Sequence, residues 1–236
     1  MNTPYGIGIV DHCGDCKLKG ASWFCNFSPD VVSGFSSIGH PSIFPESALL
    51  FAEGQMPRGV FVLCAGRVKL SAASREGRVL ILRIAEAGEV LGLSAVISAT
   101  ACELTAETAA PCQVRFVEKE NLLRFLNAHG EAGLHAAQCL SHEFQEAYRD
   151  IHDLVLARSS AGKLAKLLLS WTPDEISDTE IRIQSGLTHE EMAQMIGSSR
   201  ETVTRLMTQL KRQQLIRLEG STLVIRDRSA LQAMAA

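Results

Sequence analysis

Residues 188–206 read THEEMAQMIGSSRETVTRL. Thr188 and Glu191 have the spacing of a capping box, in which each side chain accepts a hydrogen bond from the backbone amide of the other residue. Gly197 suits the left-handed end of the helix that starts there, and residues 198–201 supply a second capping box directly afterwards. The stretch therefore predicts two helices joined by a turn at the glycine, which is a helix-turn-helix.

The second of these helices is predicted to have a polar face and an apolar back. Val203, Leu206 and Leu210 form the back. The polar side chains near its start are Ser199, Arg200, Glu201, Thr204 and Arg205. Arginine can donate two hydrogen bonds to guanine and glutamate can accept one from the cytosine amino group, which favours a recognition helix in the major groove. On an ordinary surface helix the same charges would form only weak pairs, worth ~0.2 to 0.5 kcal/mol each.

The sequence after this helix favours the nucleic-acid interpretation. Residues 215–218 and 222–225 alternate around a short turn, which predicts a β-hairpin or wing. Lys211 and Arg212 are expected to contact phosphates, which adds affinity but no sequence discrimination. From residue 158 onward, eleven Lys and Arg stand against nine Asp and Glu, whereas the rest of the chain carries twelve against seventeen. The end of the chain is therefore its more basic part.

The composition is that of a globular protein of 236 residues, with 46% hydrophobic and 21% charged residues. No apolar run approaches the ~20 residues of a membrane span, and no basic region precedes an apolar stretch at the N-terminus, so we expect a cytoplasmic protein with no membrane partner. Its seven cysteines are then expected to be reduced. No nucleophile–base set and no Walker or dinucleotide motif is found in the sequence, so no enzyme is expected.

Short apolar runs separated by glycines fill residues 45–118. Their length and spacing predict an all-β sandwich, barrel or roll. The predicted strands are residues 60–64, 67–70, 79–84 and 113–117.

A helical seam follows this β region. Apolar residues recur at steps of four, three, four and three, as in a heptad repeat. The members of the seam are Leu140, Phe144, Ala147, Ile151 and Leu154. A stripe of this kind either packs against its own domain or forms a dimer interface, and the pattern alone leaves both open.

These features together resemble the Crp/Fnr family of bacterial transcription regulators. The resemblance is carried by a β-roll with Phe51, Gly54 and Gly66, by the long helix and by residues 199–205. It implies an α+β fold with an N-terminal cyclic-nucleotide-binding-type β-roll, a long dimerisation helix and a C-terminal winged helix-turn-helix. It also implies a homodimer on a roughly palindromic site in double-stranded DNA, with RNA polymerase as a further partner.

The resemblance also bears on the base contacts. In the catabolite-activator branch of the family, the base-reading residues match Arg200, Glu201 and Arg205 here. The oxygen-sensing Fnr branch keeps Glu201 and Arg205, but it has serine where this chain has Thr204 and lacks the arginine at Arg200. The predicted recognition helix is therefore similar to the Crp type.

The default ligand of such a roll is a cyclic nucleotide. Family members that bind one contact the ribose with a Gly-Glu pair and neutralise the phosphate with an arginine that precedes Ser or Thr and Ala. Here Gly92 is followed by Leu93, residues 102–106 read CELTA, and no arginine lies between Arg83 and Arg115. Because a carboxylate repels a phosphate, a standard cyclic-nucleotide site is not expected, although a divergent ligand stays open.

Three cysteines lie close together near the N-terminus. Cys13 and Cys16 place two thiolates within reach of one metal centre, and Cys25 follows in the same arm. Iron–sulfur clusters take four thiolates, so a fourth must come from elsewhere in the chain. Residues 106–112 resemble the segment that holds the fourth cluster cysteine in Fnr, which implies a [4Fe-4S] cluster on these three residues and Cys112.

Other uses of the cysteines remain open. Cys102 is the alternative fourth thiolate, and His12 is an alternative fourth ligand if the metal is zinc. Cys64 and Cys139 are expected to be small core residues.

The interpretation divides the chain into a cysteine-rich sensory arm (1–27), a β-roll (28–128), a dimerisation helix (129–157) and a winged helix-turn-helix (158–236). It predicts a dimeric regulator that senses oxygen or redox state through the cluster. The rival is a small-effector-responsive regulator without a cluster, with a non-standard ligand in the roll and cysteines that are unligated or zinc-bound.

Overall fold

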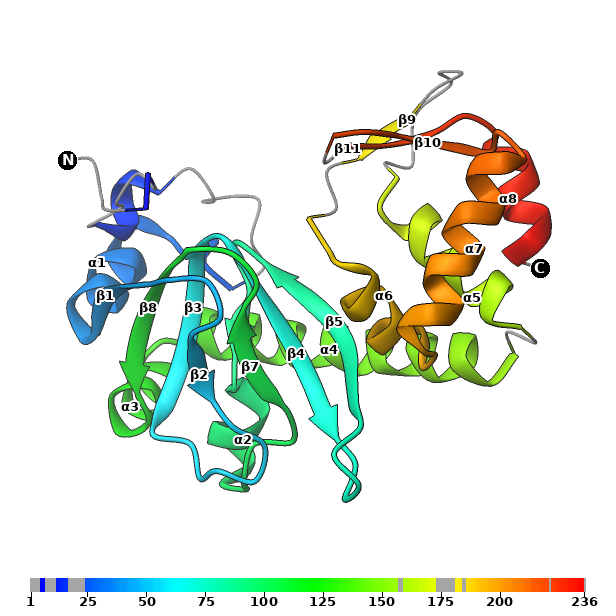
Figure 1. The fold of residues 1–236 in the computed structure, drawn as a ribbon. Coiled ribbons are helices and arrows are strands. Elements are labelled where there is room, and N and C mark those ends of the chain that lie inside the picture. The colour runs from blue at the N-terminus through cyan, green and yellow to red at the C-terminus, as the bar shows by residue number, and fades with distance from the viewer. Residues whose placement is uncertain are drawn as a thin grey trace. The chain divides into compact units, whose positions relative to one another are not determined.

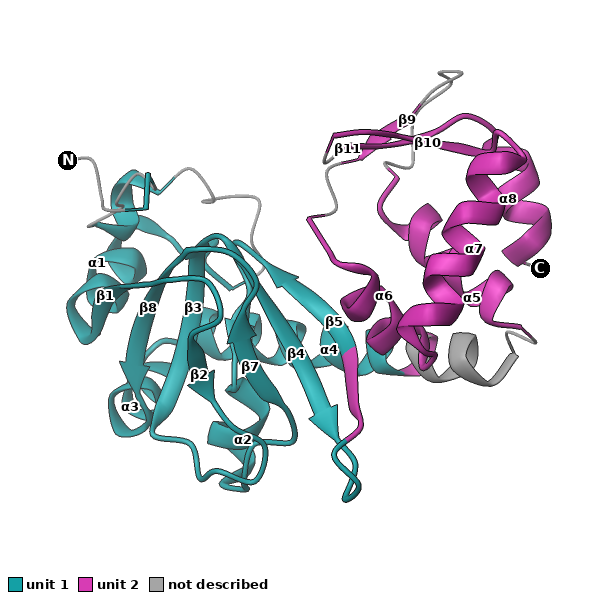
Figure 2. Ribbon diagram, viewed as in Figure 1, with its two compact units in different colours: residues 1–77, 82–147 teal, residues 78–81, 148–236 magenta. Residues whose placement is uncertain are grey.

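The structure is a computed structural model that describes residues 5–6, 12–16, 24–156, 159–172, 181–183, 186–220 and 222–235, without the side chains of 150–156. The chain divides into two compact units (Figure 2). Unit 1 comprises residues 1–77 and 82–147, and unit 2 comprises residues 78–81 and 148–236. Among the described residues, no helix combines the length and the apolar character that crossing a membrane requires.

Unit 1 contains a β-roll of two four-stranded sheets with helices before and after it (Figure 1). The sheets have the strand orders β1-β8-β3-β6 and β2-β7-β4-β5. The elements are η1 (Cys13–Asp15), α1 (Pro29–Ile38), β1 (Gly39–Phe44), β2 (Leu49–Phe51), β3 (Gly59–Ala65), β4 (Arg67–Ala73), β5 (Val79–Glu86), β6 (Val90–Leu91), α2 (Leu93–Ser98), β7 (Thr105–Thr108), β8 (Cys112–Glu118), α3 (Lys119–Ala128) and α4 (Gly130–Leu156), the last of which continues into unit 2. The four predicted strands are confirmed as parts of β3, β4, β5 and β8.

Two apolar cores lie on the two faces of the sheet that contains β3 and β8. Val60 and Val62 of β3 pack in a core with Phe35 of α1 and residues of α3 and α4. Leu63 of β3 and Val114 of β8 pack in a second core inside the roll. Since successive side chains of a strand point to opposite faces, this alternation fixes which strand residues face the helices and which face the roll.

Gly66 makes the turn between β3 and β4. Its φ of +92° lies in the region that favours glycine, and a Cβ there would come within 2.6 Å of Cys112 Sγ. Glycine therefore allows the turn to approach the start of β8 closely.

Unit 2 is a small helical domain with a three-stranded sheet of order β10-β11-β9 (Figure 1). Its further elements are α5 (Ser160–Ser170), β9 (Ile181–Ile183), α6 (His189–Ile196), α7 (Arg200–Arg212), β10 (Ile216–Glu219), β11 (Thr222–Ile225) and α8 (Arg228–Ala235). The predicted helix-turn-helix and hairpin are confirmed as α6–α7 and as antiparallel β10–β11. The α+β fold class is confirmed as well, whereas β9, which pairs with β11, is not predicted from the sequence.

Candidate nucleic-acid interface and cysteine cavity

The first helix of the motif, α6, begins and ends where the sequence predicts. Thr188 Oγ1 accepts a hydrogen bond from the Glu191 amide at 3.2 Å, and Glu191 Oε2 accepts one from the Thr188 amide at 2.8 Å. Gly197 follows the last turn with a φ of +61°, which is the left-handed conformation expected at this position. Local sequence alone thus sets the length of α6 and the start of the turn.

The cap of the second helix, α7, is Ser199 rather than Ser198. Ser199 Oγ accepts a hydrogen bond from the Thr202 amide at 3.2 Å, whereas Ser198 Oγ donates one to Ser160 Oγ of α5 at 3.4 Å. The predicted second capping box, from Ser198 to Glu201, is therefore wrong: the cap is Ser199, and it is one-sided. Glu201 lies in the first turn, where hydrogen bonds from its own amide and from Ser199 hold the pKa of its carboxyl below the usual range. The side chain is charged at neutral pH and can accept hydrogen bonds.

Replacing Ser199 by alanine is expected to lower the free energy of unfolding by about 1 kcal/mol, because the Thr202 amide loses its partner. Urea denaturation followed by circular dichroism measures this. Ser198→Ala is the matched control, and we expect a smaller loss because that hydroxyl caps no helix. Equal losses for the two variants would contradict the assignment of the cap.

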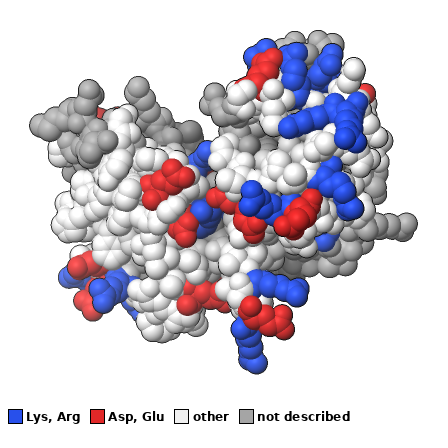
Figure 3. Space-filling view, in the orientation of Figure 1, with Lys and Arg blue, Asp and Glu red and all other residues white. Residues whose placement is uncertain are grey.

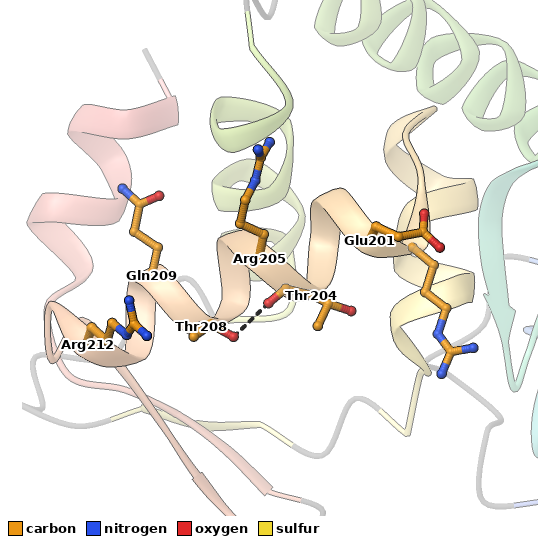
Figure 4. A pocket seen from close by; sticks show the side chains of 7 residues that line it. Glu201, Thr204, Arg205, Thr208, Gln209 and Arg212 are labelled. Carbon is orange, nitrogen blue, oxygen red and sulfur yellow. Dashed lines mark hydrogen bonds between the residues drawn. The ribbon is translucent and has the colours of Figure 1, made fainter.

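The exposed face of α7 carries a row of polar side chains. Val203, Met207 and Leu210 are fully buried in the core of unit 2, and they anchor the opposite face. Leu206, which the sequence places on the apolar back, is only partly buried. The exposed side chains line an open hollow formed by Arg200, Glu201, Thr204, Arg205, Thr208, Gln209 and Arg212 (Figure 4). The hollow is rich in groups that form hydrogen bonds with base edges or phosphates.

Two hydroxyls on this face are already held by other groups. Thr208 Oγ1 donates to the Thr204 carbonyl oxygen at 2.8 Å (Figure 4). Thr204 Oγ1 lies 3.0 Å from His189 Nδ1 of α6. Burial, together with the charges of Lys211 and Arg200, lowers the pKa of His189, so the ring is neutral at physiological pH. His189 positions Thr204, and the sequence offers no signal for this role.

Basic side chains lie at the end of α7 and in the wing. Lys211 and Arg212 are exposed in its last turn, where they complement the helix dipole. In the wing, the carboxylate of Glu219 lies 2.7 Å from Arg217 Nη2 and 2.9 Å from Arg182 Nη1. Figure 3 shows Lys and Arg gathered over the part of unit 2 that carries the wing.

The stretch of the roll where a phosphate-binding arginine would be expected, residues 102–106, carries a carboxylate. Cys102 is buried inside the roll, and Glu103 Oε1 accepts a hydrogen bond from Ser94 Oγ at 3.2 Å. Gly92, the start of the loop that would contact a ribose, adopts a φ of +81° ahead of α2. The backbone of the loop is thus present, while the charge next to it has the wrong sign for a phosphate.

Comparison with known families assigns both units. Residues 162–234 match the Crp-like helix-turn-helix domain, and residues 42–129 match the cyclic nucleotide-binding domain. The chain belongs to the Crp/Fnr family of transcription regulators. Its class is therefore that of a DNA-binding regulator, not of an enzyme.

The Crp/Fnr relatives match over nearly the whole chain. The CRP-like cAMP-activated global transcriptional regulator of Mycobacterium tuberculosis is 24% identical over 217 residues, which cover 91% of this chain and 96% of the relative. FixK2 from Bradyrhizobium japonicum has a similar fold, with a TM-score of 0.72, 21% identity and coverage of 84% of this chain and 98% of that one. The c-di-GMP-responsive regulator CLP of Xanthomonas campestris has a TM-score of 0.72, 20% identity and coverage of 85% and 100%. The ligands in these names differ, so the fold alone does not identify an effector.

Four cysteines of this Crp/Fnr chain line one cavity in unit 1. Three are the arm residues Cys13, Cys16 and Cys25, and the fourth is Cys64 of β3. The free volume is about 20 Å³, and Phe27, Val32, Phe35, Val62, Leu63, Gly88 and Arg115 complete the walls. Within the described residues, no three or more His, Cys, Asp and Glu side chains converge closely enough to hold a metal ion as they stand.

Cys112 lies elsewhere, in the core inside the roll. It is fully buried, and its Sγ donates to the carbonyl oxygens of Ala110 at 3.1 Å and Arg67 at 3.2 Å. Burial raises the pKa of its thiol, which opposes the deprotonation that metal binding requires. Cys102 is buried in the same core. The structure therefore does not bring either predicted fourth thiolate together with the arm cysteines.

A four-iron cluster does not fit this arrangement. A cavity of about 20 Å³ holds roughly one water-sized group, which is far less than a cube of four irons and four sulfides. The ligand that the Fnr resemblance supplies, Cys112, faces the other core.

The long helix α4 presents an apolar stripe to solvent. Leu134, Phe144 and Tyr148 are 59%, 63% and 61% exposed and follow a three-four spacing with Ala137 and Ser141 between them. Among the seam residues, Ala147 is also exposed, but Leu140 packs against the core of unit 1. The side chains of Ile151 and Leu154 lie outside the described residues.

Proposed function

We propose that the protein is a homodimeric, sequence-specific transcription regulator in which α7 of each protomer reads one half-site in the major groove. The observation that carries this proposal is the exposed row on α7, with Arg200 and Arg205 as donors to guanine and the charged Glu201 as an acceptor from cytosine. Lys211 and Arg212 add phosphate contacts. The regulator acts in the cytoplasm, with RNA polymerase as the machinery that it controls.

The exposed stripe on α4 is the proposed dimer interface. Its opposite face is held by the roll, because Glu143 and Glu146 of α4 lie 3.8 Å and 4.0 Å from guanidinium nitrogens of Arg83 of β5. Exposed Phe144 and Tyr148 on the outer face are large apolar groups that a second copy of the helix would bury. A dimer joined here would present two copies of α7 to one duplex, about 34 Å apart.

The proposed signal enters through unit 1, as in a small-effector-responsive regulator without a [4Fe-4S] cluster. The small cavity and the position of Cys112 support this alternative over the oxygen-sensing cluster. The Glu103 carboxylate opposes a standard cyclic nucleotide. The effector that fits best is one that acts on the thiols of the arm, or a divergent ligand of the roll.

Calorimetric titration with cyclic AMP is expected to show no saturable heat at millimolar nucleotide, because the carboxylate of Glu103 repels the phosphate. Glu103→Arg is the gain-of-charge variant, which should restore weak binding. Micromolar binding by the unmodified protein would contradict this account of the roll, while leaving the DNA-reading proposal untouched.

Sequence-specific binding itself is tested by enriching random duplexes on the immobilised full-length protein. We expect an inverted repeat whose half-sites are about one helical turn apart. Enrichment of no common sequence would remove the proposed function.

A further inference from the structure

The cysteine cavity lies where the N-terminal arm meets the β-roll. The arm is attached to α1 through the Cys13 amide, which donates to Ser36 Oγ at 3.4 Å. Cys13, Cys25 and Ile38 pack at the edge of the core that contains Phe24, which is fully buried. The arm cysteines therefore have defined positions on unit 1.

Cys64 of β3 faces this arm. Val60 and Val62 face the helical core, and Cys64 lines the cavity together with Val62. Leu63 between them faces the inside of the roll. The pairing of β3 with β8 shifts register between Leu63 and Ala65, and such a bulge re-aims the side chain inside it, which here is Cys64.

The side chain of Cys112 is directed away from the arm. It lies on the face of β8 that carries Val114, inside the roll, with two carbonyl oxygens as hydrogen-bond acceptors and Gly66 packed over its sulfur. Cys112 resembles the Fnr ligand in sequence, but Cys64 is the cysteine that faces the arm.

A buried positive charge adjoins the four thiols. Arg115 is 2% exposed, lines the cavity, and donates from Nη1 to the carbonyl oxygens of Gly39 at 2.8 Å and Ser36 at 3.2 Å. A metal ion held by four thiolates carries a net negative charge, which a guanidinium in a low-dielectric site stabilises. The cavity combines soft ligands with a charge complementary to the complex that they would form.

We propose that Cys13, Cys16, Cys25 and Cys64 form a binding site for a single thiophilic divalent ion of the zinc type. Tetrahedral coordination by four thiolates is the arrangement typical of structural zinc. The free volume of about 20 Å³ suits one ion. Because the thiols do not converge closely enough as they stand, binding requires the cysteine side chains to rotate toward the ion. A bound ion would hold the arm against the roll. Any effect of this on DNA binding rests on the proposed function, whereas the metal site itself does not depend on that function.

The test is an anaerobic titration of the reduced, metal-free, full-length protein with Co²⁺, which reports thiolate coordination by charge-transfer absorption and tetrahedral geometry by its visible bands. We expect saturation at about one ion per chain and displacement by Zn²⁺. Cys64→Ser should lower the charge-transfer intensity and weaken binding by about 10- to 100-fold, since even outer-shell partners of a metal ligand contribute that much. Cys112→Ser is the matched control and should titrate like the unmodified protein.

Three outcomes would overturn the proposal. They are a loss in Cys112→Ser as large as in Cys64→Ser, cobalt spectra without thiolate bands, and an anaerobically purified protein with stoichiometric iron and sulfide. Cys64→Ala and Cys25→Ser are two further variants. A melting curve for each shows whether it is still folded, which separates loss of a metal ligand from loss of the fold. Because no DNA is present, failure of the DNA-reading proposal would leave this titration unchanged, and failure of the titration would leave DNA recognition standing.

Discussion

The Arg205→Ala variant is expected to bind the enriched inverted repeat about a hundredfold more weakly than the unmodified protein. A bidentate contact between arginine and guanine contributes ~1 to 3 kcal/mol, and a dimer makes two of them. A total of ~3 kcal/mol corresponds to about two factors of ten in the dissociation constant. Fluorescence anisotropy with a labelled duplex, at one fixed salt concentration, measures the change.

Arg212→Ala is the matched control for this variant, because it removes an equal charge from the same helix. A phosphate contact carries no sequence information, so its loss should weaken binding to specific and scrambled duplexes alike and should reduce the salt dependence. Arg205→Ala should instead abolish the difference between the two duplexes. If Arg205→Ala weakened both duplexes equally, the assignment of Arg205 to base reading would be contradicted.

The Phe144→Glu variant is expected to be monomeric and to lose specific DNA binding by about a thousandfold or more. The proposed interface buries an apolar stripe on α4 against its own copy, so a carboxylate there meets a second carboxylate in an apolar contact. A monomer reaches only one half-site, and specific binding typically exceeds non-specific binding by ~10³ or more. Sedimentation velocity and anisotropy measure the two effects on the same sample.

Met56→Glu is the control for this substitution. Met56 is 58% exposed, close to the 63% of Phe144, but it lies in the loop between β2 and β3. The control should remain dimeric with unchanged DNA affinity. A dimeric Phe144→Glu variant would show that the protomers associate elsewhere.

Local signals in the sequence predict the helix-turn-helix well. The ends of α6 follow from Thr188, Glu191 and Gly197, each of which acts on backbone groups within four residues. The error at the start of α7 concerns two neighbouring serines that are equally good caps by type. The amide of Ser198 still donates to the Ala193 carbonyl oxygen at the end of α6, so Ser199 is the cap of α7.

The cysteine cavity could not be predicted in the same way. The residues of β3 around Cys64 form a continuous apolar run, so their polarity gives no period from which to tell the two faces of the strand apart. The facing direction of Cys64 depends on its pairing with β8 and on the register shift beside it. Resemblance along the sequence instead indicates Cys112, whose side chain is directed into the other core.

The sequence leaves the exposed face of α4 ambiguous for a related reason. Two overlapping stripes with three-four spacing run along this helix, one through Leu140 and one through Leu134 and Tyr148. Only the packing of α4 against the roll shows which stripe is exposed.

The most direct test of the central claim is guanine methylation protection on the enriched duplex, because methylation occurs at N7 in the major groove, where Arg200 and Arg205 are proposed to donate. We expect protected guanines in two patches about one helical turn apart. The Arg205→Ala variant should lose that protection even at protein concentrations high enough to occupy the DNA site. Guanines that remain fully reactive under saturating unmodified protein, or protection that persists in the variant, would contradict it.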